Sequence, residues 1–324
     1  MRQLDRAFDV LELLSNEEYR SGETLAAKLG VSRVAIWRQI ERLKKIGVDI
    51  SSVSGQGYRT QTEFETLNPA KIHENLARGV ELDESSIRVT KVVDSTNAVL
   101  MRLSPSREQQ VLFSEYQTAG KGRREDEWIS PPGGGLWFSL SRCFDNPPSS
   151  FSALGLVVGI SVISGLQKLG IKGLQLKWPN DVVFEGAKLA GILIELRSEV
   201  SGPCFAVIGI GVNTSLSLVA RRRIDKKVID VEQLSKKRLS RNLIASVLLS
   251  SLDENLRAFE QSGFKSFRDK WAKFDFLFGK ELKILCGSRV ETGLAEGVDE
   301  IGALLLRREG EVKQILSGHI VELL

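Results

Sequence analysis

Residues 117–124 read Gln117-Thr118-Ala119-Gly120-Lys121-Gly122-Arg123-Arg124, and they follow residues 111–116, whose apolar pattern predicts a β-strand. Glycine lets the backbone approach a ligand closely, so successive N–H groups here can form a concave anion site, to which Lys121 and Arg123 add full charges. The stretch therefore predicts an anion site, suited to phosphate, at the end of a strand. A flexible basic surface loop stays open as the alternative, because the spacing matches neither the P-loop nor GxGxxG.

A second stretch, Lys177-Trp178-Pro179-Asn180-Asp181, ends another predicted strand at residues 174–178. A lysine beside a phosphate would neutralise charge that develops at phosphorus during displacement. Asp181 is a candidate to orient that lysine or to hold Mg²⁺. An ordinary Pro-Asn-Asp turn with a surface lysine explains the same residues.

Three further groups are candidates for ligand binding, and each has an ordinary structural alternative. Ser95-Thr96-Asn97 offers hydroxyls and an amide that suit a polar ligand head, but such residues are also common helix N-caps. Gly209-Ile210-Gly211-Val212-Asn213, which overlaps a predicted strand at residues 204–210, would fit against a flat ring or form sheet core. Trp128 would close over a ligand or be a half-buried aromatic residue.

Composition excludes several classes of protein. The chain has 324 residues, 42% hydrophobic and 27% charged, which is ordinary globular usage and excludes wholesale disorder. The longest apolar stretch, residues 153–163, is shorter than the roughly 20 residues that cross a bilayer, and charges near the N-terminus interrupt any signal peptide. We therefore expect a cytoplasmic protein without membrane contact. Three widely spaced cysteines predict reduced thiols, and the only histidines, His73 and His319, leave little material for histidine-based catalysis or metal sites.

The first sixty residues predict three short helices and a hairpin. Gly30 ends the second helix, Ser32 caps a third over residues 32–45, and Ser54-Gly55-Gln56-Gly57 predicts the hairpin tip. Residues 21–60 hold seven cations and three acids, an excess of four that equals the net charge of the whole chain. A winged helix-turn-helix that binds DNA is the prediction, and a helical adaptor with a solvated basic face is the alternative.

A polar stretch at residues 63–69 predicts a linker to a larger domain. That domain mixes strands with one long helix, residues 152–169, and is not a regular βαβ series, so its expected class is α+β. A further helical stretch covers residues 239–259. Short strands with glycine-containing turns from residue 279 onward predict a small terminal barrel.

Six motifs follow one another along the chain: Ser-Thr-Asn, Glu-Tyr-Gln-x-Ala-Gly-x-Gly-Arg-Arg, Trp-x-Ser-Pro, Lys-Trp-Pro-Asn-Asp, Lys-Leu-Ala-Gly-Ile-Leu-x-Glu-Leu and Gly-Ile-Gly-x-Asn. In this order they resemble the motifs of biotin protein ligase. Because a predicted winged helix-turn-helix precedes them, the chain resembles the bifunctional form, a biotin–[acetyl-CoA-carboxylase] ligase that is also the biotin operon repressor. The resemblance implies three domains: the DNA-binding winged helix-turn-helix at residues 1–62, a mixed-sheet ligase domain like that of class II aminoacyl-tRNA synthetases at 66–275, and an SH3-like barrel at 276–324.

What the resemblance implies is a two-step reaction. The biotin carboxylate attacks the α-phosphate of ATP, with Mg²⁺, and gives biotinyl-5′-AMP and pyrophosphate. A lysine amine of the biotin carboxyl carrier protein of acetyl-CoA carboxylase then takes the biotin. Two anions must meet in the first step, which explains the need for lysine and arginine, and the reactive adenylate must be shielded from water, which explains the need for a closing loop.

The resemblance also implies roles for single residues. Those implied in catalysis are Lys177 and Arg123. Those implied in binding biotin are Ser95, Thr96, Asn97, Gln117, Lys121, Gly122, Arg123 and Lys177. Those implied around ATP and the adenylate are Trp128, Gly209, Gly211 and Asn213, with Asp181 as the candidate for Mg²⁺. Those implied in DNA binding are Arg33, Trp37, Arg38, Gly55, Gln56 and Gly57.

In this family, adenylate binding favours a homodimer whose two winged domains grip an inverted-repeat operator. The chain departs from the pattern in three places: Glu125-Asp126-Glu127 replaces glycine and further cations, Lys121 replaces arginine, and Leu323 replaces an arginine. We expect the acidic run to weaken adenylate retention or to change how the loop closes. Two other functions stay open: a non-catalytic, ligand-responsive winged-helix repressor, and a lipoate or octanoate protein ligase.

Overall fold

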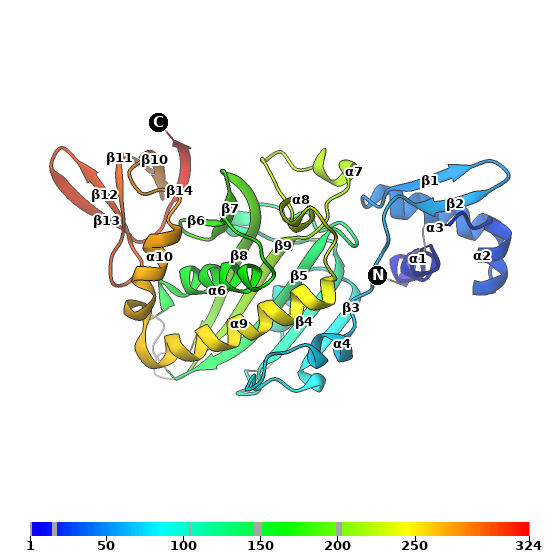
Figure 1. Cartoon of the computed structure of the whole chain (residues 1–324), viewed down its shortest axis with the longest axis horizontal. Helices are drawn as coiled ribbons and strands as arrows, with labels where there is room; N and C mark the ends of the chain where they lie inside the picture. Colours follow the sequence, from blue (N-terminus) through cyan, green and yellow to red (C-terminus); the bar gives the residue numbers. More distant parts are fainter. Residues whose placement is uncertain (1, 15–17, 104, 146–150, 199–202, 324) are drawn as a thin grey trace.

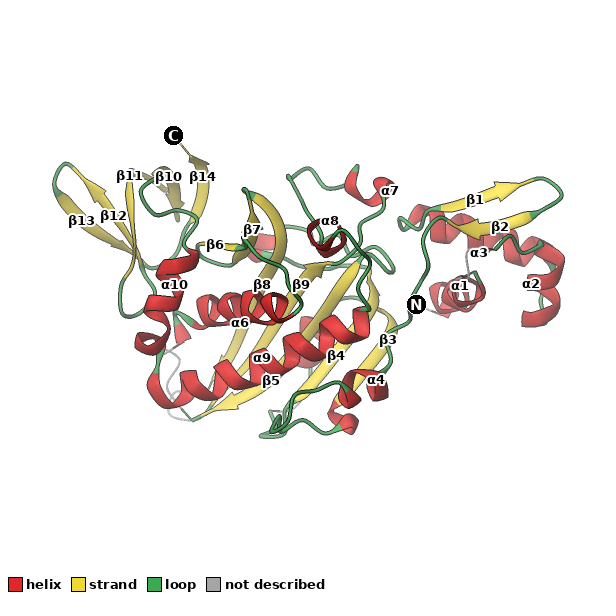
Figure 2. Ribbon diagram, in the orientation of Figure 1, coloured by secondary structure: helices red, strands yellow, loops and turns green. Residues whose placement is uncertain are grey.

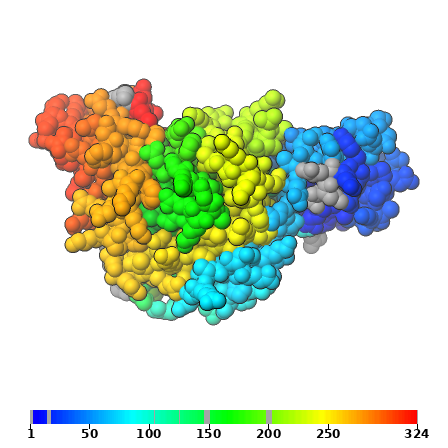
Figure 3. All heavy atoms as spheres, in the orientation of Figure 1, coloured from blue at the N-terminus to red at the C-terminus, as the bar shows by residue number. Residues whose placement is uncertain are grey.

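The computed structural model describes residues 2–14, 18–103, 105–145, 151–198 and 203–323. Figure 1 shows three parts along the long axis: the N-terminal helices and hairpin at one end, a large sheet with helices in the middle, and a small sheet at the other end. In the space-filling view the N-terminal part projects as a lobe from the central part (Figure 3). None of the helices in the described ranges combines the length and apolar character that a bilayer crossing requires.

The N-terminal part is a helix-turn-helix followed by a hairpin, as predicted. Its elements are α1 (Arg2–Leu13), α2 (Gly22–Leu29), α3 (Arg33–Lys45), β1 (Ile50–Val53) and β2 (Gly57–Thr60). The turn between α2 and α3 forms because Gly30 is left-handed, with φ 63°, and Ser32 Oγ accepts a hydrogen bond from Ala35 N at 3.2 Å. In the hairpin Gly57 has φ 113°, and a Cβ there would lie 2.1 Å from Arg20 O, so only glycine fits.

The central part is a seven-stranded mixed sheet of order β3-β4-β5-β9-β8-β7-β6. Its strands are β3 (Ile87–Val93), β4 (Gln110–Gln117), β5 (Gly135–Phe144), β6 (Gln175–Lys177), β7 (Asp181–Phe184), β8 (Ala187–Ser198) and β9 (Cys204–Asn213). Strands β3 and β4 run parallel, and the other neighbouring strands run antiparallel. The mixture of parallel and antiparallel pairs with separate helices confirms the predicted α+β class.

Helices cover this sheet and connect its strands. They are α4 (Pro69–Glu74), α5 (Thr96–Met101), α6 (Leu154–Lys168), α7 (Leu218–Arg221), α8 (Val231–Ser235), α9 (Arg241–Ser262) and α10 (Arg268–Phe274), with short 3₁₀ turns at η1 (Glu84–Ser86), η2 (Arg123–Glu125) and η4 (Phe264–Phe267). Figure 2 shows α6 and α9 side by side over one face of the sheet. Helix α6 is apolar on nearly every side because the sheet covers one side of it and α9 and α10 pack against it as well.

The N-terminal part packs against the edge of the central sheet. Its apolar core includes Phe64, from the predicted linker, and Val92, from β3. Across the same boundary Lys91 Nζ lies 2.6 Å from Asp9 Oδ1. The segment after the hairpin is therefore packed in place rather than a free tether, because Phe64 is only 7% exposed.

The C-terminal part is a five-stranded antiparallel sheet of order β13-β12-β11-β10-β14. Its strands are β10 (Glu281–Cys286), β11 (Arg289–Val298), β12 (Leu304–Arg308), β13 (Glu311–Ile315) and β14 (His319–Leu323). Among the described residues the pairing leaves β13 and β14 as separate edges, so the sheet is open as paired. Trp178 joins this part to the centre, because its Nε1 donates to Gly302 O at 3.1 Å.

Candidate active site

A cavity of about 470 Å³ opens between the central sheet, the segments at 117–129 and 223–228, and the C-terminal part. It brings together Lys177 and Arg123, which the chain carries on separate elements. The residues predicted for DNA lie elsewhere, on α3 and the β1–β2 hairpin. Every residue predicted for biotin, adenylate or metal lines the cavity: Ser95, Thr96, Asn97, Gln117, Lys121, Gly122, Arg123, Trp128, Lys177, Asp181, Gly209, Gly211 and Asn213.

The basic stretch after β4 is an ordered hairpin. Trp128 N donates to Gly120 O at 2.9 Å, and Gly122 N donates to Asp126 O at 2.6 Å. A Cβ on Gly120 would lie 2.5 Å from Trp128 O, so glycine is required where the two arms meet. Arg124 turns the tip with φ 55°. These bonds place Arg123 at the cavity, which supports the predicted anion site.

A polar network lies beneath the cavity at the start of α5. Gln117 Oε1 accepts from Thr96 N at 2.8 Å, and Asn97 Nδ2 donates to Glu195 Oε2 at 2.8 Å. The Ser139 hydroxyl lies 2.7 Å from Thr96 Oγ1 and 2.5 Å from Asn97 Oδ1. Sequence analysis missed Ser139 and Glu195, although a serine and a glutamate inside predicted apolar strands are the signal that finds them.

The sequence left two roles open for Ser95, a helix N-cap and a ligand contact, and the structure shows the N-cap geometry. Ser95 Oγ accepts from Ala98 N at 3.4 Å, so the side chain begins α5. The residue still lines the cavity, next to the polar network. Ser95 therefore orients the first turn of α5, which carries Thr96 and Asn97.

The glycines of β8 and β9 leave room for side chains from other elements. A Cβ on Gly211 would lie 2.4 Å from the Trp128 indole, and one on Gly191 would lie 2.7 Å from it. A Cβ on Gly209 would lie 2.2 Å from Asn97 Oδ1. The strands therefore form a floor on which Trp128 lies, and this floor exists only because these positions have no side chain.

The cavity has an excess of positive charge. Burial lowers the pKa of Lys177 below its ordinary value, with Asp181 acting in the opposite direction. Burial also lowers the pKa of Arg123, and the neighbouring Arg124 adds to this. An anion in the cavity would offset the cost of burying these two charges, because a nearby negative charge favours the charged forms of Lys177 and Arg123. The cationic residues along the lining are Lys121, Arg123, Arg124, Lys177, Lys188, Arg223 and Lys226, and the acidic ones are Asp126, Glu127, Asp181 and Asp225.

Asp181 lies between two lysines. Its backbone lies opposite that of Lys177 in the β6–β7 hairpin, and its Oδ1 lies 2.7 Å from Lys188 Nζ. Lys188 Nζ also lies 5.2 Å from the centre of the Trp128 ring. Within the described ranges no three Asp, Glu, His or Cys side chains form a metal cluster. One carboxylate suits Mg²⁺ only where phosphate oxygens and water supply the remaining ligands.

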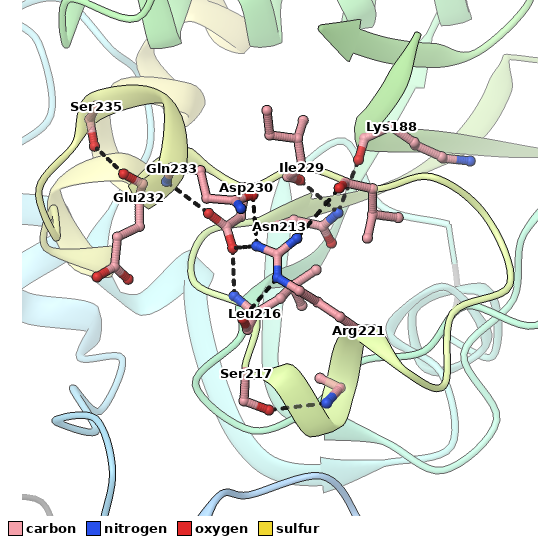
Figure 4. Close-up of polar contacts among 12 residues, drawn as sticks. Lys188, Asn213, Leu216, Ser217, Arg221, Ile229, Asp230, Glu232, Gln233 and Ser235 are labelled. Atoms are coloured by element: carbon pink, nitrogen blue, oxygen red, sulfur yellow. Dashed lines mark hydrogen bonds and ion pairs between the residues drawn. The ribbon is translucent and has the colours of Figure 1, made fainter. Parts of the chain in front are cut away.

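The segment that covers the cavity after β9 is fixed at both ends (Figure 4). Asn213 Nδ2 donates to Lys188 O and to Ile229 O, both at 3.2 Å. Asp230, which is 2% exposed, accepts from Leu216 N at 2.8 Å and forms an ion pair with Arg221. Residues 223–228 are thus held over the cavity by buried polar contacts, which neither motif nor periodicity had indicated.

The acidic run that departs from the family pattern has a partner on this covering segment. Asp126 Oδ2 lies 2.7 Å from Lys226 Nζ, and this hydrogen bond lowers the pKa of Asp126. The side chain of Glu125 lies outside the described part of the structure. The sequence signal for Lys226 was the cationic run at residues 221–227, which sequence analysis did not use.

The C-terminal part contributes its own residues to the cavity. Gly318, His319 and Ile320 line it, and Arg124 Nη2 donates to Leu285 O at 3.1 Å. Burial lowers the pKa of His319, and the positive charges of Arg124 and Lys226 lower it further. His319 was not among the predicted site residues, and no motif indicated that β14, from the end of the chain, reaches the site.

Comparison with known proteins covers nearly the whole chain. Residues 6–59 match the HTH domain family, and residues 89–213 match the biotin/lipoate A/B protein ligase family. The bifunctional ligase/repressor BirA of Salmonella typhimurium is 35% identical over 316 residues, 96% of this chain and 95% of that protein, and BirA of Escherichia coli has the same identity and coverage. The biotin protein ligase from Aquifex aeolicus, solved in complex with biotin and ATP, has a TM-score of 0.63 and 32% identity, covering 72% of this chain and 97% of that one.

Proposed function

This chain belongs to the biotin protein ligase family, in its bifunctional ligase/repressor form, and we propose from that membership how its cavity works. The protein is a biotin–[acetyl-CoA-carboxylase] ligase with biotin and ATP as substrates, and it is also a DNA-binding repressor. In the proposed cycle, a carboxylate oxygen of biotin attacks the α-phosphorus of ATP and pyrophosphate leaves. A carrier lysine amine then attacks the biotinyl carbonyl carbon, AMP leaves and the amine proton passes to solvent.

The meeting of Lys177 and Arg123 in one cavity is the observation that carries this proposal. Both reactants of the first step are anions, so they approach each other only where positive groups offset their repulsion. Burial already disfavours these two cations, as their lowered pKa values indicate, and the incoming anions stabilise them. We assign Lys177 and Arg123 to the charge that develops at phosphorus, with Lys121 and Gly122 completing the anion-binding loop.

The two ends of biotin would meet different surroundings. Its polar head fits the network at Ser95, Thr96, Asn97 and Gln117, where hydroxyls and amides are already oriented by their neighbours. Its carboxylate end would point towards Lys177. Such a division fixes the direction in which biotin enters the cavity.

The adenylate would lie over the floor that Trp128 makes on β8 and β9, with Gly209, Gly211 and Asn213 around it. Asp181 would hold Mg²⁺ together with nucleotide phosphates, where the ion would neutralise phosphate charge. The hairpin at 117–128 and the segment at 223–228 would keep water from the mixed anhydride.

Several finer features of the chain are also part of the proposal. We assign residues 1–62, 66–275 and 276–324 to separate domains, the second like that of class II aminoacyl-tRNA synthetases and the third an SH3-like barrel. The antiparallel order of β10–β14 supports the barrel. The proposed partners are the biotin carboxyl carrier protein of acetyl-CoA carboxylase and an inverted-repeat operator, bound by an adenylate-loaded homodimer in the cytoplasm.

Incubation with labelled biotin, ATP, Mg²⁺ and a biotin carboxyl carrier domain tests the enzyme. Label on the carrier lysine, dependent on ATP, is the expected result. Tight binding of biotin without transfer would instead indicate a non-catalytic repressor. Transfer of lipoate or octanoate alone would indicate the related ligases of the same fold.

Replacing Gly209 by alanine should raise the KM for biotin about 10-fold or more without unfolding the protein. The added Cβ would meet Asn97 Oδ1 at 2.2 Å and break a buried polar network, an effect of about 1–3 kcal/mol. Steady-state kinetics with varied biotin measures it. Gly155→Ala is the matched control, because the nearest atom to its Cβ would be at an ordinary 3.5 Å. Equal KM values for the two variants would show that Asn97 does not take part in biotin recognition.

Biotin and ATP together should strengthen operator binding, because adenylate is proposed to favour the dimer that matches a two-fold site. A gel-shift titration with and without both substrates measures the affinity, and sedimentation velocity measures the dimer. If operator affinity is the same with and without biotin and ATP, the regulatory part of the proposal is wrong.

A further inference from the structure

The outward face of α3 carries two large apolar side chains. Val34 is 58% exposed and Trp37 is 53% exposed, whereas Ile36 and Ile40 on the opposite face are fully buried. Positions three and four apart share one side of a helix, so Val34, Trp37 and Arg38 form one outward surface. Ser32 caps the helix one residue before it begins, so this surface lies on its first two turns.

Positive charge surrounds these apolar side chains. Arg33 and Arg38 are their neighbours in the chain, and a hollow of about 420 Å³, with Val34 in its lining, is also lined by Arg6, Arg38 and Arg42. Arg42 is held in place there, because its guanidinium donates to Gln3 Oε1 at 2.8 Å and to Gln39 Oε1 at 3.1 Å. A hollow with three arginines suits a backbone phosphate, which would set the register of the helix without reading sequence.

The outward surface can contact only a few kinds of groups on DNA. Val34 has no polar side-chain atom, so it reads no donor or acceptor on a base edge. In the major groove thymine alone among the bases presents a methyl group, and apolar side chains are what contact it. Trp37 offers a broad apolar ring beside Val34, with a single N–H. Charge complementarity favours DNA over a second protein chain as the occupant, because residues 21–60 hold seven cations and three acids.

We propose that Val34 and Trp37 read the methyl groups of thymines in each half-site of the bound DNA, while the hollow at Arg6, Arg38 and Arg42 takes a phosphate. The inference rests on the proposed DNA-binding function and adds the base that α3 selects. Burying one methyl is worth about 0.8 kcal/mol, which is about fourfold in affinity. Two thymine methyls in one half-site are therefore worth about 15-fold.

The test starts from a random duplex pool bound to the full chain with biotin, ATP and Mg²⁺. Each thymine of the enriched sequence is then replaced by deoxyuridine, which pairs identically but lacks the methyl. The expected result is a loss of about fourfold at one or two positions of each half-site and no loss at the other thymines.

Two variants test whether side chains of α3 cause the loss of affinity on replacing thymine by deoxyuridine. With Val34→Ala the discrimination between thymine and uracil should vanish at one position, and with Trp37→Ala at another. Both side chains are exposed, so neither change removes core packing. Val290→Ala is the matched control, since this valine is 52% exposed on the C-terminal sheet and should leave discrimination unchanged.

The outcomes separate this inference from the proposed function. A pool that yields no bound sequence would overturn the DNA-binding proposal and this inference with it. A bound sequence whose affinity is the same with uracil at every position would overturn the inference alone. Retained discrimination in both α3 variants, or a loss of self-association in them in place of the methyl effect, would overturn it as well.

Discussion

Lys177→Ala is expected to slow the formation of biotinyl-5′-AMP about 10²–10³-fold and to leave the fold intact. Lys177 ends the short strand β6 at the cavity, outside the apolar core. Its charge faces the place where carboxylate and phosphate must meet, and removing it leaves their repulsion less balanced in the transition state. In the variant the neighbouring Asp181 still forms its ion pair with Lys188, whose Nζ lies 2.7 Å from Asp181 Oδ1, so no unpaired acid is left in the sheet.

Pyrophosphate release in the absence of carrier measures this step by itself. Lys172→Ala is the matched control, because that exposed lysine lies just before β6 and should keep the parent rate. Lys177→Arg should recover part of the rate, since it keeps the charge with a different shape. In the parent, burial lowers the pKa of Lys177, so the rate should fall as pH rises through that lowered value and the cation is lost. An adenylation rate within about threefold of the parent in Lys177→Ala would remove the proposed role.

Deleting residues 1–62 is expected to abolish operator binding while much of the ligation remains. The deletion removes α3 and the hairpin, which carry the predicted DNA-binding residues, whereas every predicted ligand residue lies from Ser95 onward. The structure adds a cost that the sequence did not indicate. Phe64 and Val92 belong to the core of the deleted part and would become exposed, so the truncated chain should have a lower melting temperature.

Gel shifts, carrier labelling and thermal unfolding on the truncated chain measure the three effects. Arg38→Ala in the full chain is the matched control: it should weaken operator binding and keep both the melting temperature and ligation. Unchanged operator affinity after truncation would refute the assignment of the N-terminal part. A loss of ligation in a truncated chain that is still folded would show that the active site depends on contacts with the N-terminal part, such as the hydrogen bond from Ser217 Oγ to Gly47 O at 3.2 Å.

Local pattern predicted the elements well. The helix expected at residues 152–169 is α6, Leu154–Lys168, and the strand expected at 111–116 is β4, Gln110–Gln117. A continuous apolar run of the right length suffices there, because both elements are buried on nearly every side. The same reasoning missed β7, Asp181–Phe184, which is only four residues long.

The sequence by itself determined which residues are candidates to bind anions and nucleotides, because each motif is a local stretch of chain. The tertiary structure alone decided which residues from other segments lie next to these candidates. Sheet order places β9 between β5 and β8, so Gly209 and Gly211 meet Asn97 and Trp128 from distant segments. The ion pair of Asp126 with Lys226 joins residues far apart in the chain, and such pairs depend on how whole elements pack rather than on any periodic signal.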